Sequence, residues 1–415
     1  MKKLFDWSWR VTLVLLPWQT RWFVDTKLAG WSWAQGSWSA YVTWLPMIAT
    51  VVLGAILFRG EERRLLNKKN SLILLGFLVT SIIAVLLSLD WLLRTTAVIQ
   101  WWIQIGLLGA FVWSLVGARV SKDDLVKVFV LSLVPVALFG CWQFAAQHIA
   151  ASSWFGVAAQ DPRSLGVAVI EVLDLRALRV YGSFPHPNIF GGWLAIGISV
   201  SLWLVSRTSR KRSVVAWSCV SALFAVTLLL TFARGAWIAA AVGLILLAVR
   251  LWQLRADVSM SRQYFFVGVL CCAIAVGVIG YTQRVFVFAR VEAQGRLEVK
   301  SIDERTQSLK DGVAIFLKHP IFGSGPNGEM LDLDRSRNIP LQPPHNVFLL
   351  FLDDFGIVGL VLVGGFLFLN RAAAKTFFVS AYWIVIPLAI VGLFDHYLFS
   401  LWAGQVLLFT ACLLA

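Results

Sequence analysis

Charged residues are scarce in this chain of 415 residues. Asp, Glu, Lys and Arg together make up 14% of it, whereas 59% of the residues are hydrophobic. A soluble protein of this length would carry far more charge on its surface. The shortage excludes a soluble globular protein and predicts a chain that crosses a membrane several times.

Cysteines and acidic residues are also few. All five cysteines lie inside hydrophobic runs, so we expect apolar filler rather than disulfide partners or metal ligands. The 22 acidic residues stand against 36 Lys and Arg, a net charge of +14. That excess could indicate nucleic-acid binding, but it is concentrated in short links between hydrophobic runs. There it reports the orientation of membrane helices.

Twelve apolar runs are long enough to span a bilayer. They lie near 8–24, 40–58, 71–89, 96–117, 126–146, 189–205, 214–231, 236–252, 264–282, 347–369, 377–394 and 398–415. The first run is the weakest candidate, because Pro17 interrupts it and Arg10 and Arg21 flank it. The sequence therefore predicts an all-α polytopic membrane protein with about twelve transmembrane helices, forming a single integral membrane domain over 1–415.

The links between these runs fall into two sets. The short, strongly basic links are 59–69, 119–127, 207–212, 250–262 and 371–375. The opposite set contains two long loops, 147–188 and 283–346, and the second is nearly neutral, with nine Lys or Arg against eight Asp or Glu. Because basic links stay on the cytoplasmic side, both long loops are expected to face outward.

The second long loop contains a segment with helical periodicity, 302–318. Its apolar residues share one face and its charged residues the other, which predicts an amphipathic helix lying on the membrane or on the bundle. Arg305 falls at the edge of the apolar face. Its guanidinium either binds an anion beneath the helix or reaches for lipid headgroups.

Two histidines stand at the ends of the long loops. His345 follows two prolines and precedes a predicted helix, whose positive end would keep the imidazole neutral and able to accept a proton near neutral pH. It is a candidate general base, with a position at the membrane surface as the alternative. The junction 182–188 repeats this layout and could place His186 and Asn188 beside His345. A helix cap with a rigid entry turn is the alternative there.

Arg234 lies in the tight outward link 231–235. A turn that short places the arginine at the membrane surface or slightly inside it, where a charge is costly and is usually paired or functional. Contact with lipid headgroups is the alternative. Two arginines around one outward cavity would suit a diphosphate, because the planar guanidinium can bind phosphate oxygens through two parallel hydrogen bonds. The acidic pair Asp332 and Asp334 is weak evidence for a metal, and we predict no metal site.

These motifs together resemble the bacterial O-antigen ligase and polymerase superfamily. The likeness rests on Thr231 to Gly235, on Arg305 followed by His319-Pro320 and Gly323-Ser324-Gly325, and on His345-Asn346 leading to Gly356 to Gly359. Their order and spacing carry the resemblance, and the topology extends it over nearly the whole chain. Ala233 departs from the pattern, since relatives often have serine before the arginine.

The resemblance implies a GT-C-like enzyme of the bacterial inner membrane with its active site in the periplasm. Without metal or cofactor it would transfer a glycan from undecaprenyl diphosphate, with inversion at the anomeric carbon. His345 would be the general base, and Arg234 and Arg305 would hold the diphosphate. The other predicted substrate contacts are His186, Asn188 and Asn346.

Three functions remain open at this point. An O-antigen ligase, whose acceptor is the lipid A–core oligosaccharide, is favoured over a polymerase, whose acceptor is another lipid-linked glycan. From a different class, a polytopic transporter would normally show repeated halves and broken helices, and the sequence shows neither. Membrane lipids are expected partners in each case, and nucleic acid is not.

Overall fold

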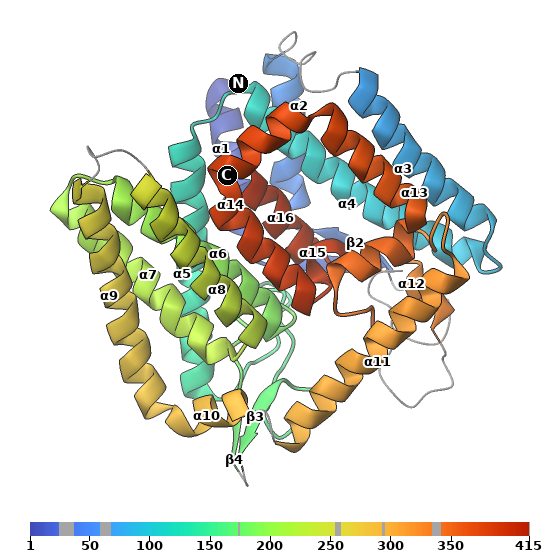
Figure 1. Ribbon diagram of the computed structural model, residues 1–415. Coiled ribbons are helices and arrows are strands. Elements are labelled where there is room, and N and C mark those ends of the chain that lie inside the picture. The colour runs from blue at the N-terminus through green and yellow to red at the C-terminus, as the bar shows by residue number, and fades with distance from the viewer. Residues whose placement is uncertain are drawn as a thin grey trace.

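The computed structural model describes residues 1–24, 37–58, 68–172, 175–253, 259–292, 295–333 and 342–414. It is an α-helical bundle with two small hairpins (Figure 1). The helices on the predicted apolar runs are α1 (Lys2–Leu15), α2 (Trp44–Leu57), α3 (Lys68–Leu86), α4 (Trp91–Gly117), α5 (Lys122–Ala146), α6 (Pro187–Arg207), α7 (Lys211–Thr231), α8 (Arg234–Gln253), α9 (Ser259–Thr282), α13 (Val347–Leu369), α14 (Arg371–Phe394), and the pair α15 (Tyr397–Ser400) and α16 (Trp402–Leu414).

The remaining elements lie in the connections. They are α10 (Arg284–Glu292), α11 (Arg296–Lys318), α12 (Glu329–Asp332), β1 (Arg21–Val24), β2 (Trp38–Tyr41), β3 (Val169–Val172) and β4 (Leu175–Leu178). β1 pairs with β2 and β3 with β4, both antiparallel. The elements of the two long loops, β3–β4 and α10–α11, lie together at the lower end of the bundle in Figure 1. The predicted basic segments 59–67 and 254–258 fall outside the described residues.

Nine helices among the described residues are long and apolar enough to cross a membrane. This confirms the all-α polytopic fold, and three of the twelve predicted runs contain shorter helices. The expected spans near 8–24, 40–58 and 398–415 contain helices of only 14, 14 and 13 residues. Each is about 20 Å long at 1.5 Å per residue, against a hydrocarbon core of about 30 Å.

A break in the backbone shortens two of these three runs. α1 ends before Pro17, which has no N–H to continue the helix, and the chain proceeds into β1. In the last run Leu401 is extended (φ −119°, ψ 140°) and separates α15 from α16. Hydropathy registers the apolar run but not this interruption.

α6 is the central helix. Its spanning window is 94% buried, and it packs against α5, α7, α8, α9, α14 and α16. Gly192 allows the closest approach: a Cβ there would lie 1.9 Å from the hydroxyl of Tyr397 in α15. A glycine is required where two elements come this near. The contact sets the link between α14 and α15 against the start of α6.

α13 is broken at Gly356, which has a non-helical backbone (φ 59°, ψ −160°). The segment 320–325 supplies the missing partners. Ser324 N–H donates to the Asp353 carbonyl at 2.7 Å, and Ile357 N–H donates to the Pro320 carbonyl at 2.9 Å. A neighbouring segment that satisfies the freed backbone groups makes such a break tolerable within a membrane. The sequence analysis expected no broken helix, because a lone glycine does not reveal one.

The break at Gly356 gives a stability prediction. A Cβ there would lie 2.4 Å from the Ile321 carbonyl oxygen, and the positive φ itself costs a non-glycine residue about 1–2 kcal/mol. Gly356→Ala should therefore lower the melting temperature in detergent. Gly364→Ala is the matched control, because a Cβ at that position meets nothing within 4 Å. Equal melting temperatures for the two variants would show that the break contributes nothing to stability.

α11 is the predicted amphipathic helix, extended to Arg296 at its start. Its buried face is not the predicted apolar one. Gly312 lies against α13, where a Cβ would be 2.8 Å from a methyl carbon of Leu349. Ile302 and Val313 are instead 43% and 49% exposed. The sequence allowed this helix to lie on the membrane or on the bundle. In the structure its apolar face points away from the bundle.

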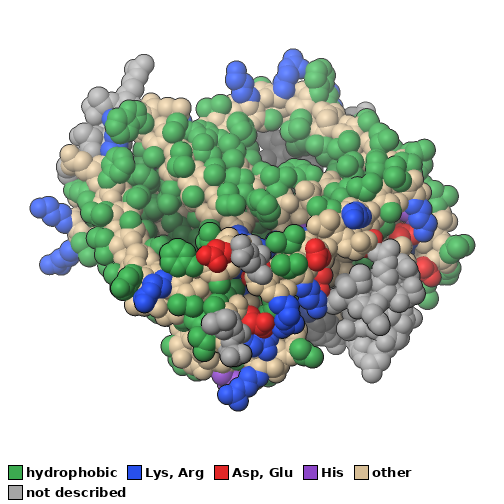
Figure 2. Space-filling view, turned by 60° about the horizontal axis from the view of Figure 1, so that its bottom comes forward, with side chains coloured by type: hydrophobic (Ala, Val, Ile, Leu, Met, Phe, Trp, Pro, Cys, Tyr) green, Lys and Arg blue, Asp and Glu red, His purple; other side chains and the backbone are tan. Residues whose placement is uncertain are grey.

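Side chains divide the surface in the same way. Figure 2 shows hydrophobic side chains over most of the upper part of its face, acidic side chains in the lower part, and Lys and Arg side chains both there and at the upper and left edges. An apolar band next to a charged end is the pattern of a protein that crosses a bilayer and exposes one end to water.

Candidate active site

Three arginines converge on one cleft where the long loops meet the bundle. Arg234 begins α8, directly after a tight turn in which Phe232 has a φ of 50°. Arg305 reaches the cleft from α11 and Arg290 from α10. The two arginines predicted from the sequence are therefore brought together, and a third joins them.

Arg290 and Glu298 were missed by the sequence analysis. Arg290 is 4% exposed, donates from Nε to the Phe232 carbonyl at 2.8 Å, and pairs with Glu298. Glu298 also pairs with Arg234, its Oε2 lying 3.2 Å from Nη2. Burial lowers the pKa of Arg290, and the hydrogen bond to Glu298 opposes that shift. The available signal was an arginine within the otherwise apolar stretch 285–291.

Of the three arginines in the cleft, Arg305 is the one whose guanidinium is available to bind a ligand. It is half-buried, and within the described ranges it makes no hydrogen bond or ion pair of its own. The cleft thus holds three guanidinium groups, and Glu298 neutralises only one of them. An excess of positive charge in a half-buried cleft favours an anion that can accept several hydrogen bonds.

Arg179 braces the back of this cleft. It is 6% exposed and donates from Nε to the Thr231 carbonyl and from Nη2 to Asn188 Oδ1, both at 2.7 Å. Burial, together with the charge of Arg290, holds the pKa of Arg179 well below its ordinary value. The sequence analysis did not single it out, because it lies in the middle of a long loop with no recognisable motif.

His345 lies directly before α13, beside Asp395 from the link between α14 and α15. The distance from His345 Nδ1 to Asp395 Oδ1 is 3.5 Å. Asp395 was missed, although an Asp-His pair between two apolar runs was a usable signal of a functional polar site. Asp395 also lines the arginine cleft. It therefore joins the histidine to the arginines.

Several donors hold Asp395 in its ionised form. Asn188 Nδ2 donates to Oδ2 at 3.0 Å, and the His396 backbone N–H donates to Oδ1 at 2.9 Å. Burial alone would raise the pKa of Asp395, but its contact with His345 lowers it below the ordinary value. Burial also lowers the pKa of the neighbouring His396 to about 4, so that ring is neutral at pH 7.

The second predicted junction does approach His345, through Asn188. Asn188 bridges Arg179 and Asp395, whereas His186 caps α6 by accepting the Asn188 N–H at 3.1 Å. Burial and the charge of Arg179 lower the pKa of His186 to about 3. Asn346 is likewise the cap of α13, accepting two backbone N–H groups at 3.0 Å. Both side chains thus cap the first turn of a helix. The substrate contacts expected of His186 and Asn346 remain predictions.

Asp332 forms ion pairs with three side chains. It pairs with Arg94 at 3.0 Å, with Lys318 at 2.6 Å and with His319 at 3.2 Å. These contacts tie α12 to α4 and to the end of α11. Asp334, the other half of the acidic pair, lies outside the described residues.

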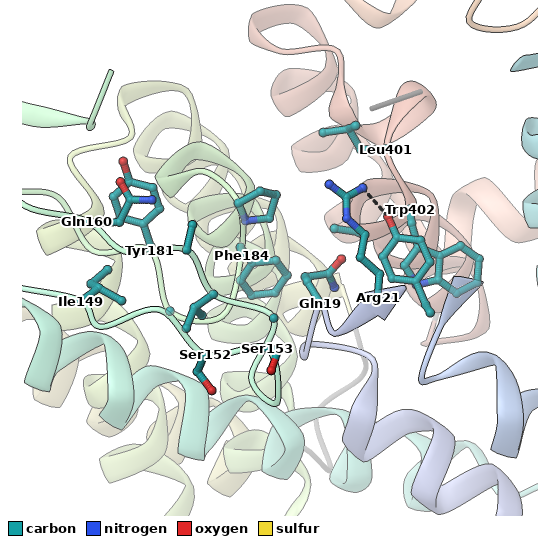
Figure 3. Close-up of a pocket in the computed structure, with 17 residues that line it drawn as sticks. Gln19, Arg21, Ile149, Ser152, Ser153, Gln160, Tyr181, Phe184, Leu401 and Trp402 are labelled. Carbon is teal, nitrogen blue, oxygen red and sulfur yellow. Dashed lines mark hydrogen bonds between the residues drawn. The ribbon is translucent and has the colours of Figure 1, made fainter. Parts of the chain in front are cut away.

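A second cavity of about 450 Å³ lies behind the 181–185 turn. Figure 3 shows first-loop residues such as Ile149, Ser152 and Gln160 on one side and Arg21 and Trp402 on the other. It is much larger than the arginine cleft, but neither the arginines nor the histidines described above line it. The candidate residues from the sequence therefore gather at the cleft and not at the larger cavity.

The fold and the site together define a polytopic membrane protein with an anion cleft and a histidine–carboxylate pair at one end. Residues 219–364 match the model of the O-antigen ligase family. This match covers the segment that contains the motifs and bears out their resemblance to the O-antigen ligase and polymerase superfamily. Its members are glycosyltransferase-like enzymes that act on lipid-linked glycans.

The matched segment contains Arg234, Arg290, Arg305 and His345. Asp395 and the first long loop lie outside it. No curated protein matches the chain significantly.

Proposed function

We propose that this protein is an O-antigen ligase of the bacterial inner membrane. It would transfer a glycan from undecaprenyl diphosphate to a hydroxyl of the lipid A–core oligosaccharide on the periplasmic side. The observation that carries the proposal is the position of Asp395, which lines the arginine cleft and lies 3.5 Å from His345. A site for a diphosphate and a site for a proton acceptor therefore adjoin.

The arginines serve the leaving group. As the bond between the anomeric carbon and the phosphate oxygen breaks, negative charge grows on the diphosphate. Arg305 and Arg234, with Arg290 behind them, place fixed positive charge where that charge develops. Groups arranged in advance in this way stabilise the transition state more than the ground state.

His345 serves the acceptor. In the tautomer that acts as a base, Nδ1–H is directed at Asp395 and Nε2 carries the lone pair. That nitrogen lies 2.9 Å from Oε1 of the exposed Gln342, at a position which an acceptor hydroxyl could take. The hydroxyl proton passes to Nε2 while its oxygen attacks the anomeric carbon opposite the leaving diphosphate, which inverts that centre. Asp395 then stabilises the imidazolium.

We propose that transfer is independent of metal, because the arginines supply the positive charge that a divalent cation would otherwise provide. Purified enzyme treated with EDTA should keep its full rate of transfer. Added Mg²⁺ or Mn²⁺ should not raise the rate of the treated enzyme. A rate that falls with EDTA and returns with either ion would contradict a diphosphate site made of arginines alone.

The acceptor separates ligase from polymerase. Purified enzyme is supplied with undecaprenyl-diphosphate-linked glycan and either lipid A–core or a second lipid-linked glycan. Product on lipid A–core is expected. Chain extension of the lipid-linked glycan, with lipid A–core unused, would establish the polymerase instead.

The transporter has one observation in its favour, the broken helix α13. Broken helices in transporters line a central binding site, whereas the segment 320–325 fills the break here through backbone hydrogen bonds. Uptake of a solute by reconstituted vesicles, with no glycan transfer by the same preparation, would favour the transporter.

The proposed orientation is open to cysteine labelling. In a background without the five native cysteines, Ser153→Cys and Ser301→Cys should react with an impermeant thiol reagent in intact spheroplasts. Ser209→Cys, in a basic link, is the control and should react only after the membrane is opened. The opposite pattern would place the arginine cleft in the cytoplasm and exclude a periplasmic reaction.

A further inference from the structure

Three side chains beside the cleft have the donor set of a transition-metal site. His345, Asp395 and His396 each offer one ligand atom, and these atoms all lie within 4.8 Å of one another. The three side chains are 16%, 11% and 12% exposed, so the set is largely shielded from water. We propose that these residues bind one divalent transition-metal ion, best Zn²⁺, and that the bound ion inhibits glycan transfer. The inhibition rests on the proposed function, whereas the binding does not.

The hydrogen bonds on the far sides of the two rings support this proposal. His345 Nε2 lies 2.9 Å from Gln342 Oε1, an atom that can only accept, and the tautomer that satisfies this contact has the hydrogen on Nε2 and a lone pair on Nδ1. His345 Nδ1 is buried and has no hydrogen-bond partner in the described part of the chain. It therefore presents a lone pair to the carboxylate of Asp395.

His396 is held in the same way. Its Nδ1 lies 2.6 Å from Ser400 Oγ, and that hydroxyl donates to the His396 carbonyl at 3.2 Å. When the serine hydrogen is used in that bond, Nδ1 donates to Oγ and Nε2 carries a lone pair. Two lone pairs and a carboxylate then face one another with no hydrogen between them, an arrangement that a cation would satisfy. Histidine ligands of metals usually have their other ring nitrogen fixed by such a partner.

The spacing and the chemistry favour zinc. Asp395 Oδ1 lies 3.5 Å from His345 Nδ1 and 4.0 Å from His396 Nε2. Ligand atoms about 2.0–2.1 Å from a tetrahedral Zn²⁺ lie about 3.4 Å apart, so small side-chain movements would close the site. Two imidazoles and one carboxylate suit Zn²⁺, whereas Mg²⁺ and Ca²⁺ prefer oxygen ligands.

Metal binding and catalysis need opposite tautomers of His345. As a base, the ring directs Nδ1–H to Asp395 and keeps Nε2 free for the acceptor hydroxyl. As a ligand, it binds the metal through Nδ1, and its Nε2 carries the hydrogen. A bound ion would also take the carboxylate that stabilises the imidazolium, so the metal form cannot accept the proton.

Binding can be measured without any transfer assay. Untagged enzyme, stripped with EDTA and desalted, is titrated with Zn²⁺ by calorimetry, and with Co²⁺ to follow its visible absorption. We expect one site in the wild type, lost in His396→Gln, a variant that keeps a polar side chain of similar size. His148→Gln is the matched control, because this exposed histidine lies outside the set, and it should retain the site.

Inhibition is measured on the same preparations. Zn²⁺ should slow transfer by the wild type and EDTA should restore it. His396→Gln should need at least about tenfold more Zn²⁺ for the same fractional inhibition of its own metal-free rate. Absence of binding by the wild type, or equal binding by the wild type and His396→Gln, overturns the site whatever the transfer rate is. Binding that leaves transfer unchanged overturns the inhibition. Binding by an enzyme that transfers no glycan refutes the proposed function and leaves the metal site supported.

Discussion

Replacing His345 with alanine is expected to lower the turnover of glycan transfer about a hundred- to ten-thousandfold, the usual cost of losing a general base. Donor binding should be largely intact, because the three arginines of the cleft come from α8, α10 and α11, and His345, which precedes α13, does not line the cleft. Turnover and donor affinity must therefore be measured separately. His345→Gln, which keeps a polar group of similar reach but cannot accept the proton at neutral pH, should lose as much turnover.

His148→Ala is the control for this pair, since it removes an exposed histidine far from the proposed chemistry in the sequence. Its rate should equal that of the wild type. Normal turnover by His345→Ala would show that the base assignment is wrong. A defect confined to donor affinity would also contradict it and make His345 a structural residue of the donor pocket.

The second large effect is expected at Arg305. Arg305→Lys keeps a positive charge but loses the planar fork that binds two phosphate oxygens. A hydrogen bond to a charged group contributes about 1.5–3 kcal/mol. At about 1.4 kcal/mol for each factor of ten, donor use should fall roughly ten- to a hundredfold. Because Arg305 has no ion pair in the described part of the chain, the variant should keep its melting temperature.

Lysine variants of two further arginines serve as comparisons for Arg305→Lys. Arg296→Lys, on the same helix and with a side chain that is 74% exposed, should transfer glycan normally. Arg234→Lys should weaken donor use as Arg305→Lys does, and it should also lower the melting temperature because Arg234 pairs with Glu298. If Arg305→Lys behaves like Arg296→Lys, then Arg305 does not contact the diphosphate.

The membrane class and the residues of the recognised motifs could be predicted from the sequence. Apolar runs report transmembrane helices because partition into a bilayer depends on local composition. Arg234, Arg305 and His345 could be singled out as candidates because each stands in a short motif at the end of an apolar run or on a periodic helix. The amphipathic character of α11 followed from its periodicity, but the face that it buries did not.

Only the tertiary structure decided which groups meet. Arg290, Glu298 and Asp395 carry no motif, and their roles come from contacts with residues distant in the chain: Asp395 reaches Asn188 across 207 positions. Packing also decided that Gly356 breaks a helix, whereas the caps formed by His186 and Asn346 are local contacts within three residues. Local sequence records the preference of each segment for membrane or helix. The charge, burial and partners of a side chain depend on segments that approach it only after folding, so they cannot be determined from the residues beside it.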